Sequence, residues 1–121
     1  MRTLRQRRGA FAEDLAVAWL IERGWRLLAR NVKVGPHDEI DIVAMDPGPP
    51  PELVCVEVRS ARSSDFGSPE ERIDRRKVAS LYRGMRVLDL EAGMPRRVDL
   101  LVVDLRGTRP NIRHLRRLAP D

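Results

Sequence analysis

Residues 39–59 read EIDIVAMDPGPPPELVCVEVR, two runs of alternating polar and apolar residues on either side of a proline-rich segment. Alternation with a period of two is typical of β-strands that bury one face. The segment Asp46–Pro51 holds four prolines and a glycine, a composition that indicates a turn. We therefore predict a β-hairpin whose strands are Glu39–Met45 and Leu53–Arg59.

The alternation also predicts which side chains share a face of this hairpin. In the first strand it places Glu39 and Asp41 on one face and Ile40 and Ile42 on the other. In the second strand the face opposite the valines holds Cys55, Glu57 and Arg59. Each strand therefore has a polar face and an apolar face.

A hairpin symmetric about Pro49 brings Asp41 opposite Glu57, and Glu39 opposite Arg59. Directly opposed carboxylates have Cβ atoms about 5 Å apart and repel each other. Mg²⁺ would relieve that repulsion, because it binds one or two carboxylates and completes its shell with waters and phosphate oxygens. Two solvated or arginine-paired acids near the end of a sheet fit the same spacing, and the pattern alone leaves both readings open.

The rest of the chain supplies two helices and further strands around the hairpin. The predicted elements are a helix over Gly9–Arg23, a strand over Trp25–Val34, a helix from a cap at Ser68 to about Leu90, a strand over Val98–Leu105, and a weak edge strand or basic tail over Asn111–Leu118. Residues 1–121 thus form a single α/β domain, a mixed sheet flanked by helices in the order α-β-β-β-α-β-β.

Composition favours a polyanionic partner and an intracellular setting. The net charge is +5, and the 23 basic residues comprise 21 arginines and 2 lysines. Guanidinium groups bind phosphate with two hydrogen bonds, although genomic base composition alone can also enrich arginine. Cys55 is the sole cysteine, which excludes an internal disulfide, and no apolar run is long enough to span a membrane. We expect a soluble, cytoplasmic protein with no membrane partner.

A resemblance extends over nearly the whole chain. The motifs that carry it are Gly9-x-x-Ala12-Glu13-x-x-Ala16, Asn31-x-Lys33, Glu39-Ile-Asp41-Ile-Val-Ala44, Val56-Glu57-Val58-Arg59, Phe66-Gly67-x-Pro69, Lys77 and Arg97-x-Asp99. In order and spacing they resemble the bacterial YraN-like family of predicted endonucleases, which is related to archaeal Holliday junction resolvases. The resemblance implies the restriction-endonuclease-like PD-(D/E)XK fold.

The same resemblance implies a role for each matching acidic residue. Asp41 and Glu57 would be the ligands of a catalytic Mg²⁺, for which Mn²⁺ would substitute, and Glu13 would add a third carboxylate from the first helix. Glu39 would reach the metal through water or pair with Arg59. The implied activity is endonucleolytic cleavage of DNA, including branched or recombination intermediates, in DNA repair.

Two positions depart from the family pattern. Arg59 stands where the family has a catalytic lysine, and arginine cannot serve as a base because it stays protonated, although it can stabilise charge on the phosphate. Asp38 stands where the family has glycine, and it adds a side chain that can narrow the approach to the site or supply a spare ligand. Whether catalysis survives is therefore left open by the sequence.

Several basic residues flank the predicted cleft. As phosphate contacts we consider Arg62, Arg72, Arg75, Arg76 and Lys77, with a solvated helix face as the equal alternative. His37, His114 and Cys55 have weaker claims as site residues, and Arg97 with Asp99 is better explained as a structural pair.

Two other functions remain open beside the nuclease. A chain that kept the fold and lost turnover would be a nucleic-acid-binding module, and one without DNA affinity would be an adaptor for other proteins. A homodimer would suit paired strand cuts, but no heptad pattern demands one.

Overall fold

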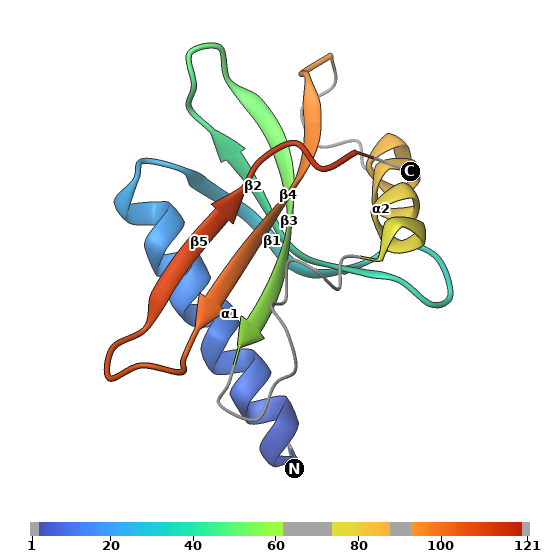
Figure 1. Ribbon diagram of the computed structural model, residues 1–121. Coiled ribbons are helices and arrows are strands. Elements are labelled where there is room, and N and C mark those ends of the chain that lie inside the picture. Colours follow the sequence, from blue (N-terminus) through green and yellow to red (C-terminus); the bar gives the residue numbers. More distant parts are fainter. Residues whose placement is uncertain (1–2, 62–73, 88–92, 120–121) are drawn as a thin grey trace.

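The computed structural model describes residues 3–61, 74–87 and 93–119 (Figure 1). Within these ranges the elements are α1 Leu4–Glu22, β1 Arg26–Lys33, β2 Glu39–Asp46, β3 Glu52–Ala61, α2 Arg75–Val87, β4 Arg96–Asp104 and β5 Asn111–Leu115. The predicted α/β fold and its order of elements are confirmed. Neither of these two helices combines the length and apolar character that crossing a membrane requires.

The strands form one open sheet in the order β1-β2-β3-β4-β5. Neighbours run antiparallel except β3 and β4, which are parallel. Parallel neighbours need a crossover connection, and α2 lies between these two strands in the chain. Figure 1 shows α1 and α2 against opposite faces of the sheet. Of the two alternatives predicted for the last segment, β5 confirms the edge strand.

The predicted hairpin and its register are confirmed for most of its length. β2 pairs with β3 from Asp46↔Glu52 to Ile42↔Val56, which is the register of a hairpin symmetric about Pro49. The ladder ends at Ile42 and Val56, so Asp41 and Glu57 lie just beyond the last paired residues. The two strands therefore begin to separate at the candidate site.

Each face of the sheet carries its own hydrophobic core. The core under α1 contains Ala12, Ala16, Leu20, Trp25, Ile42, Ala44, Val54, Val56, Leu101 and Val103. The core under α2 contains Ile40, Val43, Leu53, Cys55, Val78, Leu81, Met85 and Val98. Ala12, Ala16 and Leu20 of α1 and Val78, Leu81 and Met85 of α2 face these cores at the three- and four-residue spacings of amphipathic helices.

Helix α1 begins five residues earlier than predicted. Thr3 is its N-cap: the Thr3 hydroxyl accepts from the backbone N–H of Gln6, and the Gln6 side chain accepts from the backbone N–H of Thr3. A capping box of this kind satisfies two free N–H groups and stabilises a helix by about 1 kcal/mol. Predicting a start at Gly9 was wrong because the apolar period begins only after this polar first turn.

The described part of α2 begins next to Asp74. The carboxylate of Asp74 accepts from the backbone N–H of Arg76 at 2.9 Å and, more weakly, from that of Lys77 at 3.4 Å. The cap predicted at Ser68 lies outside the described residues. Asp74 fixes the first turn of α2, and with it the backbone that carries Lys77.

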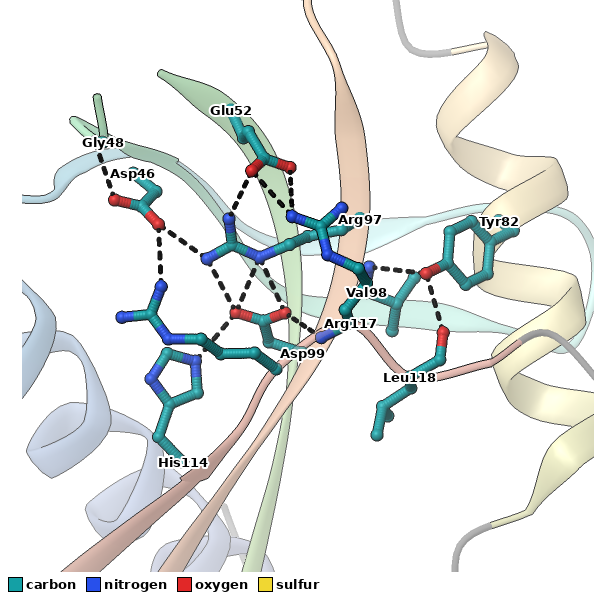
Figure 2. A network of polar contacts seen from close by, with 11 residues as sticks. Asp46, Gly48, Glu52, Tyr82, Arg97, Val98, Asp99, His114, Arg117 and Leu118 are labelled. Atoms are coloured by element: carbon teal, nitrogen blue, oxygen red, sulfur yellow. Dashed lines mark hydrogen bonds and ion pairs between the residues drawn. The ribbon is translucent and has the colours of Figure 1, made fainter. Parts of the chain in front are cut away.

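A buried polar network ties the hairpin to the two last strands (Figure 2). Arg97 lies at its centre and contacts Asp46 at 2.7 Å, Asp99 at 3.0 Å and Glu52 at 3.2 Å. Asp99 also contacts Nε2 of His114 at 2.8 Å. The predicted structural pair of Arg97 and Asp99 is confirmed and belongs to this larger network.

Candidate carboxylate site

Asp41 lies where β2 and β3 separate. Its Oδ2 accepts a hydrogen bond from the backbone N–H of Val58 at 2.8 Å, which takes the place of the next rung of the ladder. Burial of the carboxyl is the largest cause that raises the pKa of Asp41 to about 7, followed by the negative charge of Glu57. The Val58 N–H and the Lys77 ammonium act in the opposite direction. Asp41 and Glu57 are therefore close enough to interact strongly.

The side chains of β2 change faces at Asp41, and the predicted strict alternation is wrong there. Ile42 packs in the core under α1, whereas Ile40 packs in the core under α2. In the neighbouring strand Asn31, between the residues that pair with Ile42 and Ile40, has a positive φ of 54°. Asparagine tolerates this left-handed conformation better than most residues.

Sequence reasoning gave Asn31 no role of its own in the site. Asn31 lies in β1 between Arg30, which pairs with Ile42, and Val32, which pairs with Ile40. These two pairs flank the point where the side chains of β2 change faces. The side chain of Asn31 also hydrogen-bonds to Glu13. An asparagine inside a β-like run was the available signal, because asparagine is depleted in strands and enriched at positive φ.

Glu57 is the most buried carboxylate of the site, with a side chain that is 8% exposed. Its Oε1 accepts a hydrogen bond from Nζ of Lys77 at 3.0 Å, and Nη1 of Arg59 lies 3.7 Å from the same oxygen. Its Oε2 is buried and has no amine, amide or hydroxyl donor in the described part of the chain, and the carboxyl of Asp41 can hydrogen-bond to Glu57 when it is protonated. Leaving a buried carboxylate oxygen unpaired is costly, so a ligand at this oxygen would be stabilising.

Lys77 reaches into the site from α2. Together with Glu57 and Arg59 it lines a narrow cleft of about 20 Å³, whose other walls are formed by Asp74, Val78, Leu81, Leu100 and Leu118. That volume is sufficient for about one water molecule. The sequence predicted Lys77 as a phosphate contact, but it did not predict the contact with Glu57, because residues 20 apart in the chain meet only through the packing of α2 on the sheet.

Glu13 lies on the α1 side of Asp41. Its Oε1 accepts from Nε of Arg30 at 3.1 Å. Burial is the largest cause that raises the pKa of Glu13, and the charge of Asp41 raises it further, while the contact with Arg30 lowers it. Glu13 and Glu39 both line an open groove of about 680 Å³, which is completed by Gln6, Ala10, Asp14, Arg30 and Asn31.

The structure therefore brings together only part of the predicted ligand set. Across residues 3–61, 74–87 and 93–119, no three His, Cys, Asp or Glu side chains are close enough to hold a metal ion. Glu13 and Glu39 as metal ligands stay predictions. Arg59 forms an ion pair with Glu57, whereas the predicted register placed it opposite Glu39.

The other candidate residues fall outside the site or have structural roles. Arg75 and Arg76 are exposed at the start of α2, next to Lys77, whereas Arg62 and Arg72 lie outside the described residues. His37 is exposed. Cys55 is fully buried, and burial raises the pKa of its thiol to about 12, which suits a core residue.

His114 packs against the aromatic rings of α1 and of the segment after it. The ring centroids of Trp19 and Trp25 lie 5.6 Å and 5.7 Å from its own, both in edge-on contacts. With its hydrogen bond to Asp99, His114 joins β5 to α1 and to β4.

Asp38 contacts α2. Its side chain accepts a hydrogen bond from Oγ of Ser80, and its backbone carbonyl accepts from the N–H of Val34 at 3.0 Å. Asp38 thus ties the loop between β1 and β2 to α2.

Comparison with known proteins places the chain in a family. The model of uncharacterised protein family UPF0102 matches residues 12–103, a span that includes Asp41, Glu57 and Lys77. The chain belongs to this family. A UPF0102 protein of Moorella thermoacetica is 40% identical over 109 residues, covering 85% of each chain. One of Pseudarthrobacter chlorophenolicus is 40% identical over 115 residues, covering 92% of this chain and 84% of its own.

Members from other bacteria are similar at the same level. A UPF0102 protein of Bifidobacterium longum is 37% identical over 112 residues, covering 88% of each chain. The UPF0102 description names no reaction, substrate or cofactor, so a function for this chain has to be argued from its own residues.

Proposed function

We propose that this UPF0102 chain is a Mg²⁺-dependent phosphodiesterase of the PD-(D/E)XK superfamily and that it cleaves DNA. The observation that carries the proposal is the buried Oε2 of Glu57, which has no amine, amide or hydroxyl donor among the described residues and shares its surroundings with the carboxyl of Asp41. A hard divalent cation would supply a partner for Oε2 of Glu57 and would reduce the repulsion between the two carboxylates.

The chemistry of the two acids fits Mg²⁺. The cation prefers oxygen ligands and is commonly held by one or two carboxylates, with waters and phosphate oxygens completing its octahedron. Asp41 and Glu57 supply that number of carboxylates. When bound, Mg²⁺ would polarise the phosphodiester and lower the pKa of a water.

The remaining charged residues of the site suit a phosphate substrate. Arg59 is 42% exposed beside Glu57, and its guanidinium can donate to phosphate oxygens as negative charge develops on them. Arg75 and Arg76 are exposed on the first turn of α2, on the same element as Lys77. These cations are well placed to contact a DNA backbone on either side of the scissile phosphate.

Cleavage assays test the proposal directly. The full chain should cut single-stranded, duplex or branched DNA in Mg²⁺ or Mn²⁺ and should be inactive in EDTA. Asp41→Asn and Glu57→Gln keep the side-chain shapes and should lower the rate by at least about a hundredfold, because both remove a charged metal ligand. Glu22→Gln, an exposed carboxylate of α1, is the matched control and should cleave normally. Cleavage that survives both site substitutions would refute the assignment.

Metal binding can also be measured without turnover. A ligand that binds only the folded state at a hundred times its Kd stabilises a protein by about 2.7 kcal/mol. Mn²⁺ should therefore raise the melting temperature of the unsubstituted chain at constant ionic strength, and the increase should be lost in Glu57→Gln. An equal increase in both proteins would indicate binding elsewhere.

One observation favours a second function, a DNA-binding module without turnover. Arginine occupies position 59, and this side chain cannot act as a base. Such a module would bind DNA with an affinity that falls steeply with salt, in the presence or absence of Mg²⁺, and would cut none of the substrates. Restored cleavage in Arg59→Lys would then identify the lost group.

A further inference from the structure

Lys77 and Arg59 both approach the same oxygen of Glu57, and they do so unequally. Nζ of Lys77 lies 3.0 Å from Oε1, within hydrogen-bond distance, whereas Nη1 of Arg59 lies at 3.7 Å. The side chain of Lys77 is 27% exposed and that of Arg59 is 42% exposed. The lysine is therefore the closer and less solvated cation of the two.

The position of Lys77 is fixed by its helix. Asp74 accepts hydrogen bonds from the first backbone N–H groups of α2, and the neighbouring Val78 is buried in the core under the helix. The backbone that carries Lys77 is thereby held in place, and its Nζ donates to Oε1 of Glu57. The other oxygen, Oε2, has no amine, amide or hydroxyl donor in the described chain.

The cleft between these cations is small. Glu57, Arg59 and Lys77 share its wall, and its volume of about 20 Å³ accommodates about one water. A water in this cleft could donate a hydrogen bond to the carboxylate of Glu57 and accept one from the ammonium of Lys77. The ammonium has three N–H donors and no acceptor. Lysine supplies a compact point charge suited to orienting such a water, in contrast to the broad guanidinium plane.

We propose that Lys77 fills the role of catalytic lysine that Arg59 cannot fill, and that it orients the water that attacks phosphorus. The inference rests on the proposed phosphodiesterase function. In the step that it assists, the water oxygen forms a bond to phosphorus while the bond from phosphorus to the leaving oxygen breaks. The water releases its proton to solvent, and the leaving oxygen takes a proton from solvent. The helix thus supplies the group that residue 59 no longer provides.

The test compares Lys77→Met with the unsubstituted chain, because methionine keeps the apolar stem of the side chain and removes its ammonium. Single-turnover DNA cleavage should fall at least a hundredfold. Mn²⁺ affinity measured by calorimetry should stay equal or become up to tenfold tighter, because a competing positive charge has left Glu57. DNA affinity in EDTA should change less than threefold. Melting curves check that the variant is folded.

A relocated lysine provides the sharper measurement. Arg59→Lys added to Lys77→Met should recover at least tenfold of the lost rate, since position 59 also approaches Oε1 of Glu57. Arg83→Ala, which removes an exposed charge from the same helix, is the control and should leave the rate unchanged.

The possible outcomes distinguish the role of Lys77 from the proposed phosphodiesterase function. Cleavage by Lys77→Met within threefold of the unsubstituted rate overturns the role of Lys77 and leaves the phosphodiesterase standing. A fall in rate matched by an equal fall in DNA affinity also overturns it and makes Lys77 a phosphate contact. An unsubstituted chain that cuts no DNA in Mg²⁺ or Mn²⁺ refutes the function and the inference together.

Discussion

The backbone N–H of Val58 donates a hydrogen bond to Oδ2 of Asp41 across the point where β2 and β3 separate. This bond holds the carboxyl of Asp41 close to Glu57, the residue that precedes Val58 in β3. The sheet therefore opens and the two acids meet at one place. Burial and the charge of Glu57 raise the pKa of Asp41 from 3.8 to about 7.

Asp41 should destabilise the metal-free protein at neutral pH. Its carboxyl binds a proton more tightly in the folded state than in the unfolded state, so stability falls as pH rises from about 4 to about 7 and stays lower above that. The difference in pKa corresponds to as much as about 4 kcal/mol. Asp41→Asn, whose amide oxygen can still accept from Val58, should therefore unfold at higher urea concentrations than the unsubstituted chain at pH 8.

The pH dependence distinguishes this effect from a general gain in packing. At pH 4 the two proteins should have nearly equal free energies of unfolding, because Asp41 is then protonated in the folded state. Glu22→Gln, at an exposed position, should follow the unsubstituted chain at both pH values. A stabilisation by Asp41→Asn that is the same at pH 4 and pH 8 would contradict the raised pKa.

The hairpin could be predicted because two local signals agreed on it. Alternation gave the strands, and the prolines after Asp46 gave the turn, which together set the register that β2 and β3 adopt up to Ile42 and Val56. The reversal at Asp41 could not be predicted from that strand, because the residues of β2 alternate without interruption in the sequence; the irregular backbone is also seen in β1, where Asn31 has a positive φ.

The contact between Lys77 and Glu57 was beyond sequence reasoning for a different reason. It depends on how far α2 lies along the sheet, and that placement follows from tertiary packing of Val78, Leu81 and Met85. The family motifs supplied the acids of the site, but charge patterning supplied no partner for Lys77. Local patterns predict elements and faces, whereas distances between elements come from the packed core.

Gly84 permits α2 to approach the end of β1. A Cβ atom at this position would lie 2.7 Å from Cβ of Val34 and 2.8 Å from its Cγ1. Replacing glycine by alanine inside a helix ordinarily stabilises it by about 1 kcal/mol. Here Gly84→Ala should lower the free energy of unfolding by about 1–3 kcal/mol, because the added methyl overpacks the contact. Chemical denaturation measures this change.

The same contact provides a double-mutant test. Val34→Ala removes the two γ-carbons that the new methyl would meet, so part of the loss in Gly84→Ala should be recovered in the double variant. Strictly additive changes would mean that the two residues do not press on each other.

Arg97 should be among the most costly residues to replace. Its side chain is 3% exposed and contacts the carboxylates of Asp46, Glu52 and Asp99 (Figure 2). Arg97→Met removes the buried cation that these three carboxylates share, and breaking a buried ion pair in this way costs about 3–5 kcal/mol. The matched change Arg106→Met removes a partly exposed partner of Asp104 and should cost about 1 kcal/mol or less. Equal losses in urea denaturation would contradict this ranking.

The acids around Arg97 should give stability the opposite pH dependence to Asp41. Hydrogen bonds from Gly48 and Arg97 lower the pKa of Asp46 against the effect of burial, and hydrogen bonds from His114 and Arg97 do the same for Asp99. Their contribution is complete above the unfolded pKa of about 3.9 and is lost as pH falls through the lower folded values.

The two effects together predict a stability maximum for the metal-free protein at mildly acidic pH. Below about pH 4, protonation of Asp46 and Asp99 weakens the network around Arg97, and above that pH ionisation of Asp41 opposes folding. Urea denaturation from pH 2.5 to 8 should show both slopes. Asp46→Asn should flatten only the acidic slope, whereas Asp41→Asn should flatten only the slope toward neutral pH, because the two carboxylates belong to separate clusters. A single substitution that changed both slopes would show that the candidate site and the Arg97 network are coupled.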